Sequence, residues 1–283
     1  MKAVPVIAGY ALREAVRRKI FLVVLLLSLV FLALYWLGTR QAFRDTQHFV
    51  GVVPVDAHVL TGATVLGLAM FGTLFLGTVL AVFLTLGVVR GDAERGLLQP
   101  LVVRPLGRST LLVARFAGAV FVCVPYVVAL YAASVVITGA LGGWWPDRIV
   151  LPALELSAAV TLLVGLSLLG SVFLSSTANG IAIFMIFGAG LVAGLLGQIG
   201  QALGSHTLEH VARVASWVLP FEALYQDGLN QLTAHTTGFT NYALQLGPFG
   251  GSQVGGGWLA PWAAAYLMIV GAAALVGFAR RDL

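Results

Sequence analysis

The residues best suited to binding chemistry are charged side chains in one short stretch between two long apolar runs. The stretch 90–116 reads RGDAERGLLQPLVVRPLGRSTLLVARF and mixes arginines with the acids Asp92 and Glu94. Leu97 and Leu98 follow directly, so an apolar ridge lies between charges of both signs. A ridge of this kind is suited to docking a protein partner. The same composition also fits a solvated loop that only fixes membrane topology.

Two histidines, His206 and His210, are four residues apart and would share one face of a helix. A metal site needs three or four such ligands, and the sequence places no third ligand beside this pair. The spacing of a phosphate-binding loop is also missing around Gly107. We therefore expect no metal site, no nucleotide site and no catalytic residue in this chain.

Three polar residues stand inside otherwise apolar runs. Glu155 is the only acid well within such a run, and ionisable side chains in lipid are functional candidates by default. Because it lies near one end of its run, it could also reach lipid headgroups. Gln198 and Gln201 either line a polar stretch of their run or mark its end.

The composition assigns these residues to a membrane protein. Hydrophobic residues make up 59% and charged residues 10% of the 283 positions, whereas soluble domains carry about 25% charged residues. Mean hydropathy is +0.97 and the pI is about 9.7. The formal charge of +5 does not indicate nucleic-acid binding, because the basic residues are sorted by membrane side rather than gathered on one patch. We expect a single domain, 1–283.

Six apolar runs are long enough to cross a bilayer, which takes about 20 residues. Helices are expected, since a helix satisfies its own backbone hydrogen bonds in lipid. The expected fold class is therefore an all-α polytopic membrane protein with six transmembrane helices. The expected spans are 20–37, 61–89, 116–139, 151–174, 181–203 and 258–278.

The basic residues predict the orientation, because they concentrate on the cytoplasmic side of a membrane. Five precede the first span, five lie in 90–115 and two follow the sixth span, whereas the other segments hold four. Both termini and the loop 90–115 are thus expected in the cytoplasm.

Residues 1–19 combine apolar residues at helical spacing with Arg13, Glu14 and Arg17. This pattern predicts an amphipathic helix at the inner membrane face. Such a helix either only binds anionic lipid or also contacts a cytoplasmic partner.

A stripe of small residues marks the fifth span. Gly190, Gly194 and Gly197 fall near one face, and such stripes let helices approach closely. The neighbour is either a second copy of the chain or another helix of the same bundle. Beyond this span, the outer segment 204–257 carries apolar residues at helical spacing, which predicts a short amphipathic helix that ends at Pro220.

The loop 90–115 resembles the first cytoplasmic loop of type-2 ABC exporter permeases. The resemblance rests on an acidic pair, a glycine, a leucine run, an arginine–proline step and basic residues before the next span. The matching positions are Asp92, Glu94, Gly96, Leu97, Leu98, Arg104, Pro105, Arg108 and Arg115. Leu97 stands where the family has threonine, and Arg115 where it has lysine. The stretch 11–15, Ala-Leu-Arg-Glu-Ala, is similar to the permease group linked to multi-copper-enzyme maturation.

This resemblance implies a permease subunit of an ATP-driven exporter in the cytoplasmic (inner) membrane of a prokaryote. Two permease chains, identical or different, would work with two copies of a separate ATPase subunit, which would bind ATP and Mg²⁺. The chain itself would then not be an enzyme and would hold no cofactor. The residues implied to contact the ATPase are Arg90, Asp92, Glu94, Gly96, Leu97, Leu98, Arg104, Pro105 and Arg108, together with Arg13, Glu14 and Arg17.

The resemblance also implies that the outer segment caps a cavity, and it makes Glu155, Gln198 and Gln201 candidates for the translocation path. Two other classes of function stay open. A membrane anchor or assembly subunit would share the topology without transporting anything. A membrane-embedded enzyme would need ionisable groups that converge within the spans, and these are nearly absent.

Overall fold

The structure is a computed structural model, and it describes residues 19–46, 56–85, 108–236, 238, 240 and 256–280. The described residues form helices joined by short turns, and no strand occurs among them. Six of these helices are long and apolar enough to cross a membrane. The expected all-α fold with six spans is confirmed.

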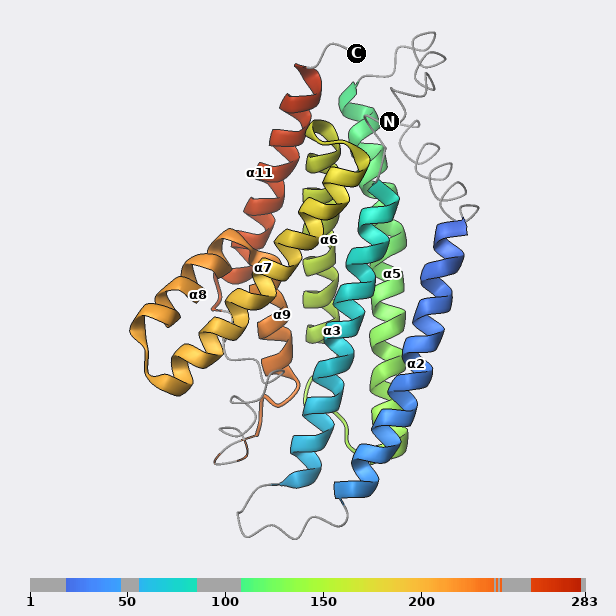
Figure 1. The fold of residues 1–283 in the computed structure, drawn as a ribbon, viewed down its shortest axis with the longest axis vertical. Coiled ribbons are helices and arrows are strands. Elements are labelled where there is room, and N and C mark those ends of the chain that lie inside the picture. The colour runs from blue at the N-terminus through green and yellow to red at the C-terminus, as the bar shows by residue number, and fades with distance from the viewer. Residues whose placement is uncertain are drawn as a thin grey trace.

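The six long helices alternate in direction along the bundle (Figure 1). Several continue beyond the apolar runs that predicted them; the first passes Arg40 and Arg44 before it ends. Once a helix has nucleated, each further residue adds to it at little cost in free energy. The ends of a helix therefore need not coincide with the ends of the apolar run. The six are α2 Lys19–Thr46, α3 Ala57–Thr85, α5 Arg108–Gly142, α6 Val150–Phe173, α7 Ser176–Leu203 and α11 Leu259–Ala279.

One end of the bundle gathers the helix ends that lead into the predicted cytoplasmic segments. The first residues of α2 and α5 and the last residues of α3 and α11 lie toward this end (Figure 1). Because α3 ends at Thr85 and α5 begins at Arg108, the segment between them starts and finishes here. We call this the 86–107 end of the bundle.

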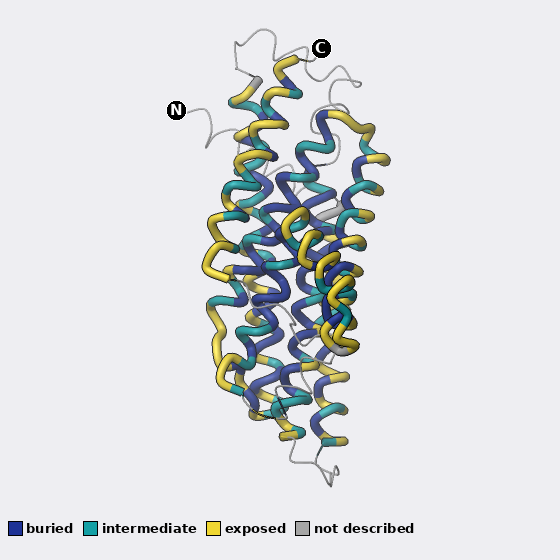
Figure 2. Tube along the Cα trace, turned by 90° about the vertical axis from the view of Figure 1, so that its left-hand side faces the viewer, coloured by how far each residue is buried: buried dark blue, intermediate teal, exposed yellow. Residues whose placement is uncertain are grey.

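The core of the bundle lies along α3 and α6. In the most apolar window of α3, 78% of the residues are buried, compared with 22% in α2 and in α11. Leu66 and Leu74 of α3 and Leu163 of α6 have no exposed surface. Figure 2 shows this buried centre in dark blue, with exposed segments on the outside of the bundle. The outward leucines of α2, among them Leu26, form a surface suited to lipid.

Two shorter helices follow α7: α8 His206–Val218 and α9 Pro220–Gln231. The predicted short helix is confirmed as α8. The helix α8 ends at Val218, two residues before Pro220. Pro220 is also the first residue of α9, a position that the fixed φ of proline favours. The sequence did not predict α9. We call α8 and α9 together the short helix pair.

Candidate functional site

The hairpin of α7 and α8 lies beside the bundle, and α9 returns from it to lie on α6 (Figure 1). The reversal uses Gly204, whose φ of 62° is in the left-handed region that glycine adopts without strain. The N–H of Gly204 donates to the carbonyl of Gln201, and that of Ser205 to the carbonyl of Gly200. These bonds satisfy the last carbonyls of α7 and join α8 to it through a two-residue turn.

The glycine stripe of α7 faces the short helix pair. A Cβ atom at Gly190 would overlap the ring of Phe221, and one at Gly194 would overlap the carboxyl group of Glu222. The close approach of α7 and α9 therefore depends on these two glycines. Gly197 is buried in the same helix. The structure thus places Gly190 and Gly194 in packing within one chain, and an interface with a second copy stays a prediction.

The intramembrane acid Glu155 lies in the second turn of α6, where α9 covers it. Its side chain is hydrogen-bonded to that of Asp227 on α9. Glu155 is 8% exposed and Asp227 is 7% exposed. The alternative that Glu155 reaches lipid headgroups does not fit this position, because a second acid and the backbone of α9 lie over it.

Glu222 is another acid of α9, and it is only 1% exposed. Burial raises the pKa of Glu222 to about 7, while a hydrogen bond with Gln226 acts in the opposite direction. Gln198 of α7 is buried, whereas Gln201 is exposed. Two of the three residues predicted for the translocation path, Glu155 and Gln198, are therefore covered by the chain's own helices in this conformation.

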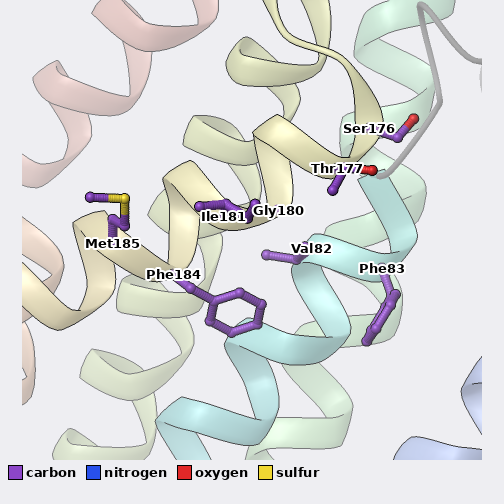
Figure 3. A pocket seen from close by; sticks show the side chains of 8 residues that line it. All are labelled: Val82, Phe83, Ser176, Thr177, Gly180, Ile181, Phe184 and Met185. Atoms are coloured by element: carbon purple, nitrogen blue, oxygen red, sulfur yellow. The ribbon is translucent and has the colours of Figure 1, made fainter.

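A groove of about 520 Å³ lies between α3 and α7. Figure 3 shows Val82 and Phe184 pointing into the space between the two helices. The hydroxyl groups of Ser176 and Thr177 lie at one end of the groove, and Met185 lies at the other (Figure 3). The groove is therefore apolar along its length and polar at the start of α7.

A polar contact next to this groove joins three helices. The hydroxyl of Thr85, the last residue of α3, shares a hydrogen bond of 2.6 Å with the hydroxyl of Ser167 on α6. Asn179 of α7 donates from Nδ2 to the carbonyl of Ser167 at 2.9 Å. Gly170 leaves room for the Asn179 side chain, which is fully buried. We call Thr85, Ser167 and Asn179 the hydroxyl–amide junction; sequence reasoning missed it, since Asn179 lies in the polar stretch between two predicted spans.

The residues predicted to contact an ATPase lie almost entirely outside the described part of the chain. The hydroxyl–amide junction is the nearest described feature, because Thr85 is the last described residue before the segment that contains most of them. Arg108 is the first residue of α5. The positions outside the described residues are Arg13, Glu14, Arg17, Arg90, Asp92, Glu94, Gly96, Leu97, Leu98, Arg104 and Pro105.

Within the part of the chain that the structure describes, no group of three or more His, Cys, Asp or Glu side chains is placed to hold a metal ion. His206 and His210 both lie on α8 and are exposed. His206 has an acidic neighbour in Glu209, with 3.9 Å between Nδ1 and Oε2.

The chain matches a known family over nearly its whole length. A family model described as ABC-2 family transporter protein matches residues 6–283. No curated protein matches the chain.

Proposed function

Because the chain belongs to the ABC-2 transporter family, we propose that it is the permease subunit of an ATP-driven exporter. Members of this family are transmembrane components that work with a separate ATPase subunit. The observation that carries the proposal is a match over 6–283 together with six spans in one bundle. The exporting direction and the coupling to ATP hydrolysis are the steps that we add.

The 86–107 end of the bundle is the proposed contact surface for the ATPase. Its basic residues favour the cytoplasmic side. The hydroxyl–amide junction would pass a displacement of the loop from Thr85 to α6 and α7, since its hydrogen bonds join all three helices. A packed bundle can be biased between two arrangements by such a displacement at one end.

The groove between α3 and α7 is the proposed wall for cargo. A long apolar surface with hydroxyl groups at one end suits an amphipathic molecule, whose polar part would meet Ser176 and Thr177. Glu155 and Gln198 would meet cargo only in a conformation in which α9 leaves α6 and α7.

The proposed working unit has two permease chains and two ATPase subunits in the inner membrane of a prokaryote. The short helix pair would then lie on the outer side, because it follows the end of α7 opposite the 86–107 end (Figure 1). ATP and Mg²⁺ would bind the partner subunits, and this chain would supply the path.

Co-purification tests the proposal directly. The tagged chain is expressed with candidate ATPase subunits and extracted in mild detergent. We expect one ATPase to co-purify in equal amount and to hydrolyse ATP in the complex. A chain that purifies alone from every candidate would overturn the proposal and leave a membrane anchor as the better description.

A charge reversal then tests the contact surface. The double variant Glu94→Arg with Arg104→Glu should lower the amount of co-purifying ATPase about tenfold, which corresponds to about 1.4 kcal/mol. The matched control is Glu209→Arg with Arg213→Glu, which reverses two charges on α8 at the other side of the membrane. Equal recovery of ATPase with both double variants would count against the loop as the contact surface.

A further inference from the structure

Two acids meet where α9 packs on α6, and neither of these two helices contains a Lys, Arg or His. From this arrangement we propose that Glu155 and Asp227 form a proton-binding site that fastens α9 to α6. The proton is the ligand, and its release to water accompanies the separation of the two helices.

The first argument is the bond between the two side chains. Glu155 and Asp227 are 8% and 7% exposed, and their carboxyl groups are hydrogen-bonded. An ionised carboxylate has no hydrogen to donate, so a hydrogen bond between two carboxyl groups requires a proton on one of them. The closed contact therefore holds at least one proton.

The second argument is the space that the chain leaves for the pair. Gly228 follows Asp227 directly, and a Cβ atom there would lie 3.0 Å from Oε2 of Glu155 and 3.7 Å from the Cα of Pro152. The glycine lets the backbone of α9 approach the first turns of α6. Without this approach, the two carboxyl groups could not meet under cover of the helices.

The third argument comes from polar atoms left without a hydrogen bond. Oε2 of Glu155 is buried and accepts no hydrogen bond, and the hydroxyl of Tyr131 on α5 is buried without a partner. Tyr131 is 1% exposed and interacts electrostatically with Glu155. Unpaired buried polar atoms are costly. Their presence beside the pair fits a site whose hydrogen bonding changes when a proton leaves.

Among the described residues, the interactions identified for Glu155 join it to acidic or neutral side chains. Tyr131 on α5 interacts with Glu155 and with Tyr35 on α2. The other titratable residues of α9 are Glu222 and Tyr225, which interact with each other. The contact from α3 is Met70, which does not titrate.

One cation lies at the margin of this contact. Arg148, just before α6, is exposed and donates to Oε1 of Gln231 at the end of α9, at 2.7 Å. Where side-chain burial is described, no Lys, Arg or His is buried. A second ionised carboxylate in the closed pair would therefore repel the first at low dielectric.

The proton balance gives the direction of the effect. In the closed contact the pair holds one proton. In the open one both carboxyl groups meet water, where such groups are ionised near neutral pH. Opening near neutral pH therefore releases one proton to water. By linkage, the equilibrium for opening rises about tenfold for each unit of pH as long as the closed pair keeps its proton and the open carboxyl groups are ionised.

This inference deepens the proposed function, because it makes the departure of α9 from α6 a proton-releasing step of an export cycle. The effect of pH on the contact does not depend on that cycle. Low pH on the side of the short helix pair would keep α9 packed on α6, and high pH would favour its separation.

Hydrogen–deuterium exchange of α9 tests the proposal in the full chain reconstituted in lipid nanodiscs. The wild type is compared with Glu155→Gln combined with Asp227→Asn at each pH between about 5 and 8. The two amide side chains can still hydrogen-bond but cannot titrate. Comparing the two proteins at equal pH cancels the intrinsic pH dependence of exchange. We expect the ratio of exchange in wild type to exchange in the variant to rise up to tenfold per unit of pH.

The control is Glu209→Gln, which removes a carboxyl group from α8 without touching the pair. If the double variant does not fold, Glu155→Gln alone is used; its amide can donate to the ionised Asp227, so the contact needs no shared proton and the slope should again be lost. An infrared band of a protonated carboxyl group that is lost in Glu155→Gln gives independent support. A ratio that stays constant across the pH range, or wild-type protein without that band, overturns the proposal. Neither measurement uses ATPase or cargo, so failure of the proton site and failure of the proposed function can be told apart.

Discussion

Two buried polar contacts lie near opposite ends of α6, about 18 Å apart along the helix. The hydroxyl–amide junction near the 86–107 end joins α6 to α3 and α7 through Ser167. The acidic pair near the other end joins α6 to α9 through Glu155. Both replace apolar packing by hydrogen bonds, but only the acidic pair contains groups that gain or lose protons. The difference separates a contact that stays fixed across pH from one that a proton can open.

The largest expected effect concerns Glu222, which lies in the same helix as Asp227. Its pKa is raised from 4.5 to about 7. Between these pH values the folded protein keeps a proton that the unfolded chain has released, so stability falls as pH rises. The loss approaches about 3 kcal/mol near pH 7 and above. Glu222→Gln should lower the pH dependence of the unfolding free energy by this amount, measured from about pH 4 to 8 in mild detergent. The dependence that remains belongs to other groups, the Glu155–Asp227 pair among them.

A change at the hydroxyl–amide junction should leave the pH dependence of the unfolding free energy as it is in wild type, because none of its groups titrates. The variant Asn179→Leu is compared with wild type over the same pH range. A pH slope that changes with Asn179→Leu, or one that stays at its wild-type value in Glu222→Gln, would break the distinction between the two ends of α6.

A steric change comes next in size. Gly190→Leu should destabilise the fold by about 2 kcal/mol, because the new side chain meets Phe221 and separates α7 from α9. Gly188→Leu is the matched control, since no atom lies within 4 Å of a Cβ atom there. Both variants gain the same helix propensity, so their difference isolates the overlap. Equal melting temperatures for the two variants would show that α7 and α9 are not held together at Gly190.

The smallest expected effect is loss of one hydrogen bond at the hydroxyl–amide junction. Asn179→Leu should cost about 1–2 kcal/mol, because the carbonyl of Ser167 loses its donor. Thr85→Val removes the other bond, and a double-mutant cycle measures whether the two are coupled. Strict additivity would mean that α3 and α7 are held to α6 independently, and would weaken the junction as a route for displacement.

The spans could be predicted from the sequence because lipid imposes both length and hydropathy on them. The same reasoning found α8, whose apolar residues repeat at helical spacing. It could not find the partner of Glu155. Asp227 lies in a polar segment that the sequence predicts to be exposed. It is buried because α9 packs against α6. Pro220 was correctly predicted to end α8, but the same proline also begins α9, which the sequence did not predict.

The groove and the hydroxyl–amide junction arise from packing and have no local pattern in the sequence. Thr85, Ser167 and Asn179 are each ordinary polar residues near helix ends, and 82 positions separate the first two. A single sequence does not say which helix faces which, so their meeting could not be foreseen. The glycines of α7 were recognised as a packing stripe, but their neighbour, α9, was unknown.

The two-residue turn at Gly204 and Ser205 gives α7 a mechanical property. Its hydrogen bonds hold α8 to the end of α7, so a tilt of α7 would carry α8 with it. A helix of 28 residues is about 42 Å long, and a tilt of about 10° around its first residues would carry the far end through about 7 Å. Asn179 lies near the fulcrum, one turn into α7. A displacement there too small to disturb the packing around Ser167 would thus be magnified severalfold at the hairpin tip.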